Sequence, residues 1–230
     1  MNRANGSKIA VVVRAKNEAE WLGACLHAVV HQDWSDLEIV VVDNGSTDGT
    51  RDIAAAHGCR IVDFPDEAFN YSKALNLGIA ATDAPLLAIL SAHCVPANEQ
   101  WLARLAMNLR DDSVVAVYGR QEPLPDSTPA DKRDLWTTFG LDRKVQIQDY
   151  FFHNANSMIR RSAWQSVPFN ERIHGVEDRD WAKKVLRDGA RIVYEPSASV
   201  FHQHGIHQDG DEERAARVVK IIELIQKDLT

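Results

Sequence analysis

The sequence predicts an α/β protein with a mostly parallel sheet flanked by helices, built as a single domain. Short apolar runs rich in β-branched residues recur along the chain, and each ends in polar or turn-forming residues, as buried parallel strands do. Segments with apolar residues at helical spacing separate these runs, which is typical of βαβ units. A length of 230 residues, with 45% hydrophobic and 26% charged residues, suits one globular domain.

The first half of the chain alternates strands and helices in a regular order. Strands are expected at residues 9–14, 37–43, 59–64 and 86–90, and helices at 21–30, 51–57 and 71–81. The fourth strand runs into a polar tip, Ser91-Ala92-His93, and Asp43 ends the second strand. Ligands of open parallel sheets bind at the carboxyl ends of the strands, so the tip and Asp43 are candidate binding positions.

The second half is less regular. Pro and charged residues are frequent in residues 122–134, which we interpret as a long surface loop. This loop is the expected boundary between a nucleotide-side half (8–120) and an acceptor-side half (121–205). The remaining expected elements are helices at 101–109, 178–187 and 206–230 and strands at 114–118, 191–195 and 200–204.

Composition excludes several classes of protein. A net charge of −7 argues against a nucleic-acid-binding protein, which needs a basic surface. No apolar run reaches membrane-spanning length, residues 1–8 lack an apolar signal core, and three scattered cysteines fit reduced thiols. We therefore expect a soluble cytoplasmic protein, with the inner face of the plasma membrane as an alternative. The apolar face of the last segment leaves a peripheral membrane contact or a homodimer open.

Two sets of residues are candidates for chemistry. Asp178 shares a helical face with the apolar Trp181 and Val185, where a carboxylate is costly unless it is used, for example as a general base. Helix capping is the alternative, and it fits Glu177 better than Asp178. His202 and His204 would face the same way on a strand, and with His93 they suggest a site for a divalent metal.

Five pieces in order resemble family 2 glycosyltransferases, which have the GT-A fold. They are residues 13–18 (Val-Arg-Ala-Lys-Asn-Glu), 41–50 (Val-Val-Asp-Asn-Gly-Ser-Thr-Asp-Gly-Thr), 73–80, the tip 91–93 and Glu177-Asp178. The resemblance covers residues 8–205 and implies inverting transfer of a sugar from a nucleotide diphosphate-sugar donor. It also implies an acceptor hydroxyl on a glycan or a lipid-linked glycan of the cell envelope.

The resemblance further implies roles for residues. Asp178 would be the general base with Glu177 beside it, and Asp43 would hold the nucleotide base. The donor side would comprise Arg14, Asn17, Glu18, Asp43, Ser46, Asp48, Lys73, Asn76, Ser91 and Ala92. Residues 151–161 are similar to the acceptor-side segment, where Asn154 and Asn156 either bind sugar hydroxyls or serve as turn residues.

The tip departs from the family pattern, because Ser91-Ala92-His93 stands where the family has Asp-x-Asp. We favour a divalent metal, Mn²⁺ or Mg²⁺, held by His93 with His202 or His204, as in the similar Asp-x-His tip of polypeptide N-acetylgalactosaminyltransferases. A metal-independent enzyme and a catalytically inactive sugar-nucleotide- or glycan-binding module are the alternatives. A nucleotidyltransferase is a third, but residues 14–18 lack the glycine-rich loop that it needs.

Overall fold

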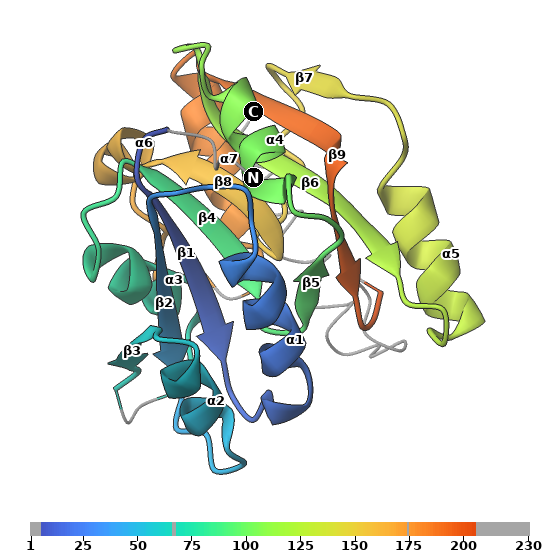
Figure 1. Cartoon of the computed structure of the whole chain (residues 1–230). Coiled ribbons are helices and arrows are strands. Elements are labelled where there is room, and N and C mark those ends of the chain that lie inside the picture. The colour runs from blue at the N-terminus through green and yellow to red at the C-terminus, as the bar shows by residue number, and fades with distance from the viewer. Residues whose placement is uncertain (1–5, 66–67, 174, 206–230) are drawn as a thin grey trace.

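The computed structural model describes residues 6–65, 68–173 and 175–205, which form one nine-stranded sheet with helices on both faces (Figure 1). The strand order is β3-β2-β1-β4-β8-β6-β9-β5, with β7 paired to β9. The strands are β1 (Ile9–Ala15), β2 (Leu37–Asp43), β3 (Arg60–Asp63), β4 (Leu86–Ser91), β5 (Cys94–Pro96), β6 (Val114–Pro123), β7 (Lys144–Gln146), β8 (Asn156–Arg160) and β9 (Arg191–His202). The predicted fold class is confirmed.

The pairing differs between the two halves of the sheet. Strands β3, β2, β1 and β4 are parallel, as the βαβ pattern predicts. Strand β8 then runs antiparallel between β4 and β6, and β9 is parallel to β6. Because β1 and β4 are adjacent, their carboxyl ends meet, and Arg14 lies opposite Ser91.

The described residues form seven helices: α1 (Ala19–Val30), α2 (Thr50–Ala56), α3 (Tyr71–Ala80), α4 (Trp101–Asn108), α5 (Pro129–Thr138), α6 (Arg161–Ser166) and α7 (Glu177–Arg187). Ile9, Val11 and Val13 of β1 belong to the core that contains residues of α1 and α4. Ala10 and Val12 belong to the core that contains residues of α3 and α7. Successive side chains of a strand face opposite ways, so a strand buried on both faces must be apolar throughout.

Two sequence-based expectations for the second half are wrong. Residues 122–134 are not one long loop, because β6 continues to Pro123 and α5 begins at Pro129. The helix start is local: Thr128 Oγ1 accepts a hydrogen bond from the Asp131 N–H, and Pro129 occupies the first turn, where its missing N–H costs nothing.

The expected strands at 191–195 and 200–204 form a single strand, β9, which ends at His202. The expected break corresponds to a shift in register, since Gly119 of β6 pairs with Glu195 while Gln121 pairs with Val200. Pro196 lies in the intervening stretch and has no N–H to donate to a ladder. The expected helix at 206–230 lies outside the described residues. No described helix is long and apolar enough to span a bilayer.

Candidate functional site

Two adjoining clefts open at the carboxyl ends of β1 and β4, and both are lined by Arg14, Tyr71, Ser91 and His93. One extends toward Glu18 and the end of β2, where Asn44 lines it. The other extends toward the first turn of α7 and is lined there by the paired carboxylates, and also by His153, Asn154, His202 and His204. The two clefts therefore adjoin along these four shared residues, one toward the end of β2 and the other toward the first turn of α7.

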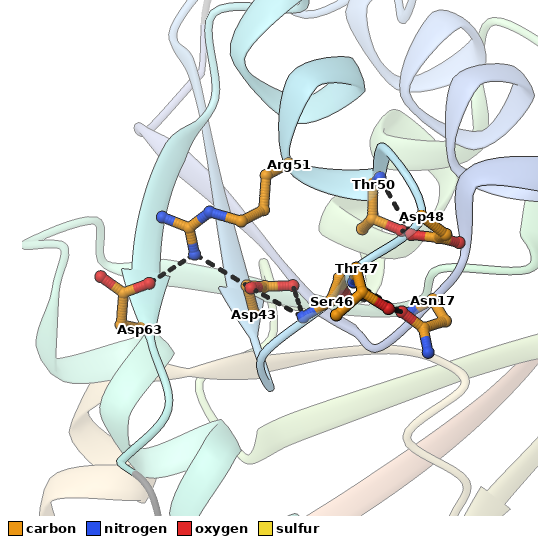
Figure 2. Close-up of polar contacts among 8 residues, drawn as sticks. All are labelled: Asn17, Asp43, Ser46, Thr47, Asp48, Thr50, Arg51 and Asp63. Carbon is orange, nitrogen blue, oxygen red and sulfur yellow. Dashed lines mark hydrogen bonds and ion pairs between the residues drawn. The ribbon is translucent and has the colours of Figure 1, made fainter.

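Asp43, at the end of β2, is a buried anion with fixed partners (Figure 2). The Ser46 N–H faces both carboxylate oxygens at 3.4 and 3.3 Å, and the Arg51 guanidinium donates to Oδ2 at 2.9 Å. Burial by itself raises the pKa of Asp43, but the hydrogen bonds from Ser46 and Arg51 outweigh it, so the pKa lies below its ordinary value. The carboxylate is thus ionised at neutral pH.

The loop after Asp43 is fastened to the residues that follow β1 (Figure 2). The Asn17 N–H donates to Ser46 Oγ at 2.9 Å, and Asn17 Oδ1 accepts from the Thr47 N–H at 2.8 Å. Asp48, two residues before Thr50, accepts hydrogen bonds from the Thr50 N–H and hydroxyl at 3.1 and 2.6 Å. The side-chain acceptors of Asn17, Ser46 and Asp48, predicted to bind the donor, hold this loop in shape.

Asn76 and Lys73 of α3 are not part of either cleft. Asn76 Nδ2 donates to Phe169 O and Glu171 Oε1, each at 2.9 Å, and its Oδ1 accepts from Trp164 Nε1 at 2.9 Å. The amide is saturated by these bonds. The bonds tie α3 to the segment before α7, and donor binding by Asn76 stays a prediction.

Asn156 is also a structural residue. It is 0% exposed, its Nδ2 donates to Arg120 O and Ala198 O, and its Oδ1 accepts from Trp101 Nε1. The acceptor-binding expectation for Asn156 is wrong, because no sugar can reach an amide enclosed between β6, β9 and α4. Ala92 is likewise fully buried in the core, so its side chain cannot contact a donor.

Asn154, the other predicted acceptor-binding residue, lines the cleft, and its backbone N–H faces Asp178 Oδ2 at 3.4 Å. Tyr71 and His153 also line the cleft and were not predicted. Tyr71 starts α3, and its ring centre lies 4.8 Å from the Arg14 guanidinium carbon. His153 lies in the segment 151–161 that the sequence singled out, but nothing in that segment distinguished it from its neighbours.

The three predicted histidines come together. The ring centres of His93 and His202 are 5.2 Å apart, those of His93 and His204 4.9 Å, and those of His202 and His204 4.5 Å. One nitrogen from each ring lies within 4.8 Å of the other two. His202 and His204 do not share a strand as expected. His204 follows the end of β9, where the Gly205 N–H donates to the buried Asp131 of α5 at 2.6 Å.

His93 has two further contacts that the sequence did not reveal. Its Nδ1 lies 3.0 Å from Glu18 Oε1, and its Nε2 lies 3.0 Å from Ser91 Oγ. Glu18 comes from the start of α1, 75 residues earlier. The spacing of Glu18 and His93 in the sequence does not predict their contact, because the parallel pairing of β1 and β4 brings the two residues together.

Glu177 and Asp178 begin α7 and face the cleft. Burial and the neighbouring Asp178 raise the pKa of Glu177 to about 7, although the Arg14 guanidinium, 3.7 Å away, opposes the shift. Burial also raises the pKa of Asp178. Glu177 is the more enclosed of the two, contrary to the expectation that Asp178 alone points inward. A carboxylate whose pKa approaches neutrality can accept a proton in catalysis.

Comparison with known proteins identifies the family. Residues 10–167 match the family model described as "Glycosyl transferase family 2". The chain is 29% identical over 195 residues to "Glycosyltransferase AglE" of Haloferax volcanii, which covers 81% of this chain and 64% of that protein. It is 26% identical over 196 residues to "O-antigen chain rhamnosyltransferase WbaN" of Salmonella anatum, which covers 80% and 61%.

The fold has solved counterparts. The mannosyltransferase PcManGT from Pyrobaculum calidifontis, solved in complex with GDP-Man and Mn²⁺, superposes with a TM-score of 0.67 at 21% identity. That match covers 85% of this chain and 56% of the mannosyltransferase. The chain thus spans just under two thirds of the length of the relatives above. From the family match over residues 10–167, the chain belongs to glycosyl transferase family 2.

Proposed function

We propose that the protein transfers a sugar from a nucleotide diphosphate-sugar to a hydroxyl of a glycan or lipid-linked glycan, with inversion at the anomeric carbon. The observation that carries the proposal is the pair of adjoining clefts, one lined by Asn44 after β2 and the other by Asp178, with three histidines beside the second. A nucleotide at Asp43 would direct its diphosphate toward the shared middle of the two clefts. The sugar would then lie near α7.

Asp178 is the proposed general base. It would take the proton of the acceptor hydroxyl, whose oxygen attacks the anomeric carbon while the bond to the diphosphate breaks on the opposite side of the sugar. The raised pKa of Asp178 supports this role, because a more basic carboxylate accepts a proton more readily at neutral pH. Arg14 supports it as well, since its guanidinium lies beside the carboxylate pair and can favour the anionic form of either member.

The histidine cluster fits a divalent cation by its donor atoms, because three imidazole nitrogens converge within 4.8 Å. His93, His202 and His204 would hold the ion, which when bound would offset the negative charge that gathers on the departing nucleoside diphosphate. The family resemblance implies Mn²⁺ or Mg²⁺, and the mannosyltransferase above was solved with Mn²⁺, but a donor set of three imidazoles is less typical of these two ions. Ser91 borders the same space and can donate its hydroxyl to a phosphate oxygen.

The relatives support a glycan acceptor. The Salmonella relative is by name a rhamnosyltransferase of an O-antigen chain. We extend this to the present chain as a class of acceptor only, that is, a carbohydrate hydroxyl on a cell-envelope glycan or its lipid-linked precursor. A cytoplasmic location is part of the same proposal.

Calorimetric binding of UDP, GDP, dTDP and CMP, each with Mn²⁺ and with EDTA, tests the donor side. One nucleoside diphosphate should bind, and Asp43→Asn should weaken it without loss of fold. Asp178→Asn should keep this binding but strongly lower the rate at which the nucleoside diphosphate is released from the matching sugar donor. Equal release by wild type and Asp178→Asn would refute the base assignment. Failure of every nucleotide to bind would refute the transferase itself and leave a glycan-binding module.

A further inference from the structure

We propose that His93, His202 and His204 form a resident metal site that prefers Zn²⁺ or Co²⁺ to Mn²⁺ and excludes Mg²⁺, with Glu18 positioning His93. The proposal deepens the proposed function, on which it rests for the use of the ion in transfer. Binding of the ion itself can be measured without a donor or an acceptor.

The types of ligand atom in the cluster determine which metal ion the site prefers. The cluster offers three neutral nitrogens, and no carboxylate of the described residues belongs to it. Imidazole suits Zn²⁺ and other late first-row ions, whereas carboxylate and water suit Mg²⁺ and Mn²⁺. Mg²⁺ also gives up its water reluctantly and is bound mainly by oxygens. The replacement of Asp-x-Asp by Ser91-Ala92-His93 therefore changes the kind of ion, rather than simply weakening the site.

The geometry is close to what such an ion needs. Zn–N bonds of about 2.0–2.1 Å at tetrahedral angles place ligand nitrogens about 3.3 Å apart. The three nitrogens here lie within 4.8 Å of one another, so the pair farthest apart must approach by roughly 1.5 Å to bind one ion, which we expect side-chain rotation to supply. Three protein ligands leave the fourth position open, where a diphosphate oxygen can bind.

The backbone holds the ligands in place before any ion arrives. Strand β5 pairs with the end of β9 so that Cys94 lies opposite His202, which places the His93 and His202 rings almost parallel, at 6°. His202 is only 2% exposed. His204 is fixed through its neighbour Gly205, which donates to Asp131 of α5. A site with this degree of order binds its ion without help from the nucleotide.

Glu18 determines which ring nitrogen of His93 is available to bind the metal ion. With Nδ1 at 3.0 Å from the Glu18 carboxylate, the ring proton belongs on Nδ1, and Nε2 carries the lone pair. The Ser91 hydroxyl at 3.0 Å from Nε2 agrees, because it can donate to that lone pair. A carboxylate that accepts the far N–H of a metal-bound imidazole orients the ring and raises its basicity. Glu18 is thus a positioning residue, acting through His93.

The test is a titration of the metal-free full chain with Zn²⁺, Co²⁺, Mn²⁺ and Mg²⁺ alone, by competition with a chromophoric chelator or by calorimetry. It uses a His31→Ala background, because His27 and His31 lie four residues apart on α1 with ring centres 4.2 Å apart and could bind an ion weakly. One equivalent of Zn²⁺ should bind at least about tenfold more tightly than Mn²⁺, with no detectable Mg²⁺. Bound Co²⁺ should show the visible bands of a low-coordinate site.

Variants separate the ligands from the positioning residue. His204→Ala, which lies outside the core, and His202→Ala should each remove the Co²⁺ bands. Glu18→Gln should keep one equivalent but weaken Zn²⁺ by about 10–100-fold. Glu20→Gln, a change at an exposed glutamate two positions along α1, is the matched control and should have no effect.

Equal affinity for Zn²⁺ and Mg²⁺ would overturn the preference, and unchanged Zn²⁺ affinity in Glu18→Gln would overturn the positioning role. Nucleotide binding in EDTA, together with no Zn²⁺ binding, would refute this site while the proposed transferase stands. Zn²⁺ binding with no nucleotide binding would refute the transferase while the metal site stands.

Discussion

Glu177→Gln should stabilise the protein at alkaline pH. Gln keeps the shape of the side chain and mimics the protonated carboxyl. Glu177 is 5% exposed, and burial with the adjacent Asp178 raises its pKa from 4.5 to about 7. At about 1.4 kcal/mol per pKa unit, ionising it in the folded chain costs about 3 kcal/mol more than in the unfolded chain. The variant avoids this cost, so its free energy of unfolding at pH 8 should exceed that of wild type by about 3 kcal/mol.

The raised pKa of Glu177 determines how the stability of the wild-type protein changes with pH. Because the folded-state pKa is raised, the protonated Glu177 contributes no penalty below pH 4.5, and wild-type stability declines as pH rises from there through about 7. Urea unfolding of wild type and variant at pH 5 and at pH 8 measures the difference, which should be small at pH 5 and large at pH 8. Asp180→Asn, a change in the same helical turn at a residue paired with Lys184, is the control and should not show this rise. A variant less stable than wild type at pH 8 would refute the argument and show that the ionised Glu177 stabilises Arg14.

Three further outcomes are expected. Asp178→Asn should lower turnover by about 10²–10⁴-fold with unchanged nucleotide affinity, measured by release of the nucleoside diphosphate and by calorimetry. Asp43→Asn should weaken nucleotide binding at least about tenfold, because an ionised acceptor binds N–H donors more strongly than an amide oxygen does. Gly119→Ala should destabilise the fold by about 1–3 kcal/mol or more, since a Cβ would lie 1.9 Å from Ala198 O. Gly140→Ala, where a Cβ meets nothing within 4 Å, is its control, and thermal unfolding distinguishes the two.

The first half of the fold follows from the sequence because its signals are local. The apolar runs at β1, β2 and β4 are continuous, since both faces of these strands are buried, and turn-forming residues end them. The second half mixes pairing directions, and there the sequence was less informative. Two strands were expected where β9 is a single strand, which passes through Pro196 near a shift in register against β6.

The backbone positions of several predicted site residues follow from the sequence. Asp43 ends β2, His93 follows β4 and Asp178 lies in the first turn of α7, so topology brings them to one edge of the sheet. The surroundings of Asn156 do not follow in this way, although it is two positions from Asn154 and shares its residue type. The two differ only in what surrounds them: Asn156 meets the Trp101 indole inside the core, whereas Asn154 lies at the cleft. Such differences depend on contacts between residues that are far apart in the sequence, which a local motif does not reveal.

The pairing of β5 with the end of β9 has a consequence for how the protein matures. Strands β1 to β4 and the Asp43 loop are complete early in the chain, whereas His202 and His204 belong to the last described strand and the turn beyond it. Chains emerge from the ribosome amino end first and their early elements can fold first. A nascent chain would therefore assemble the proposed nucleotide pocket before the three imidazoles of the proposed metal site meet. The metal ion would then bind only after β9 has paired with β5, so that only a fully synthesised domain acquires the ion.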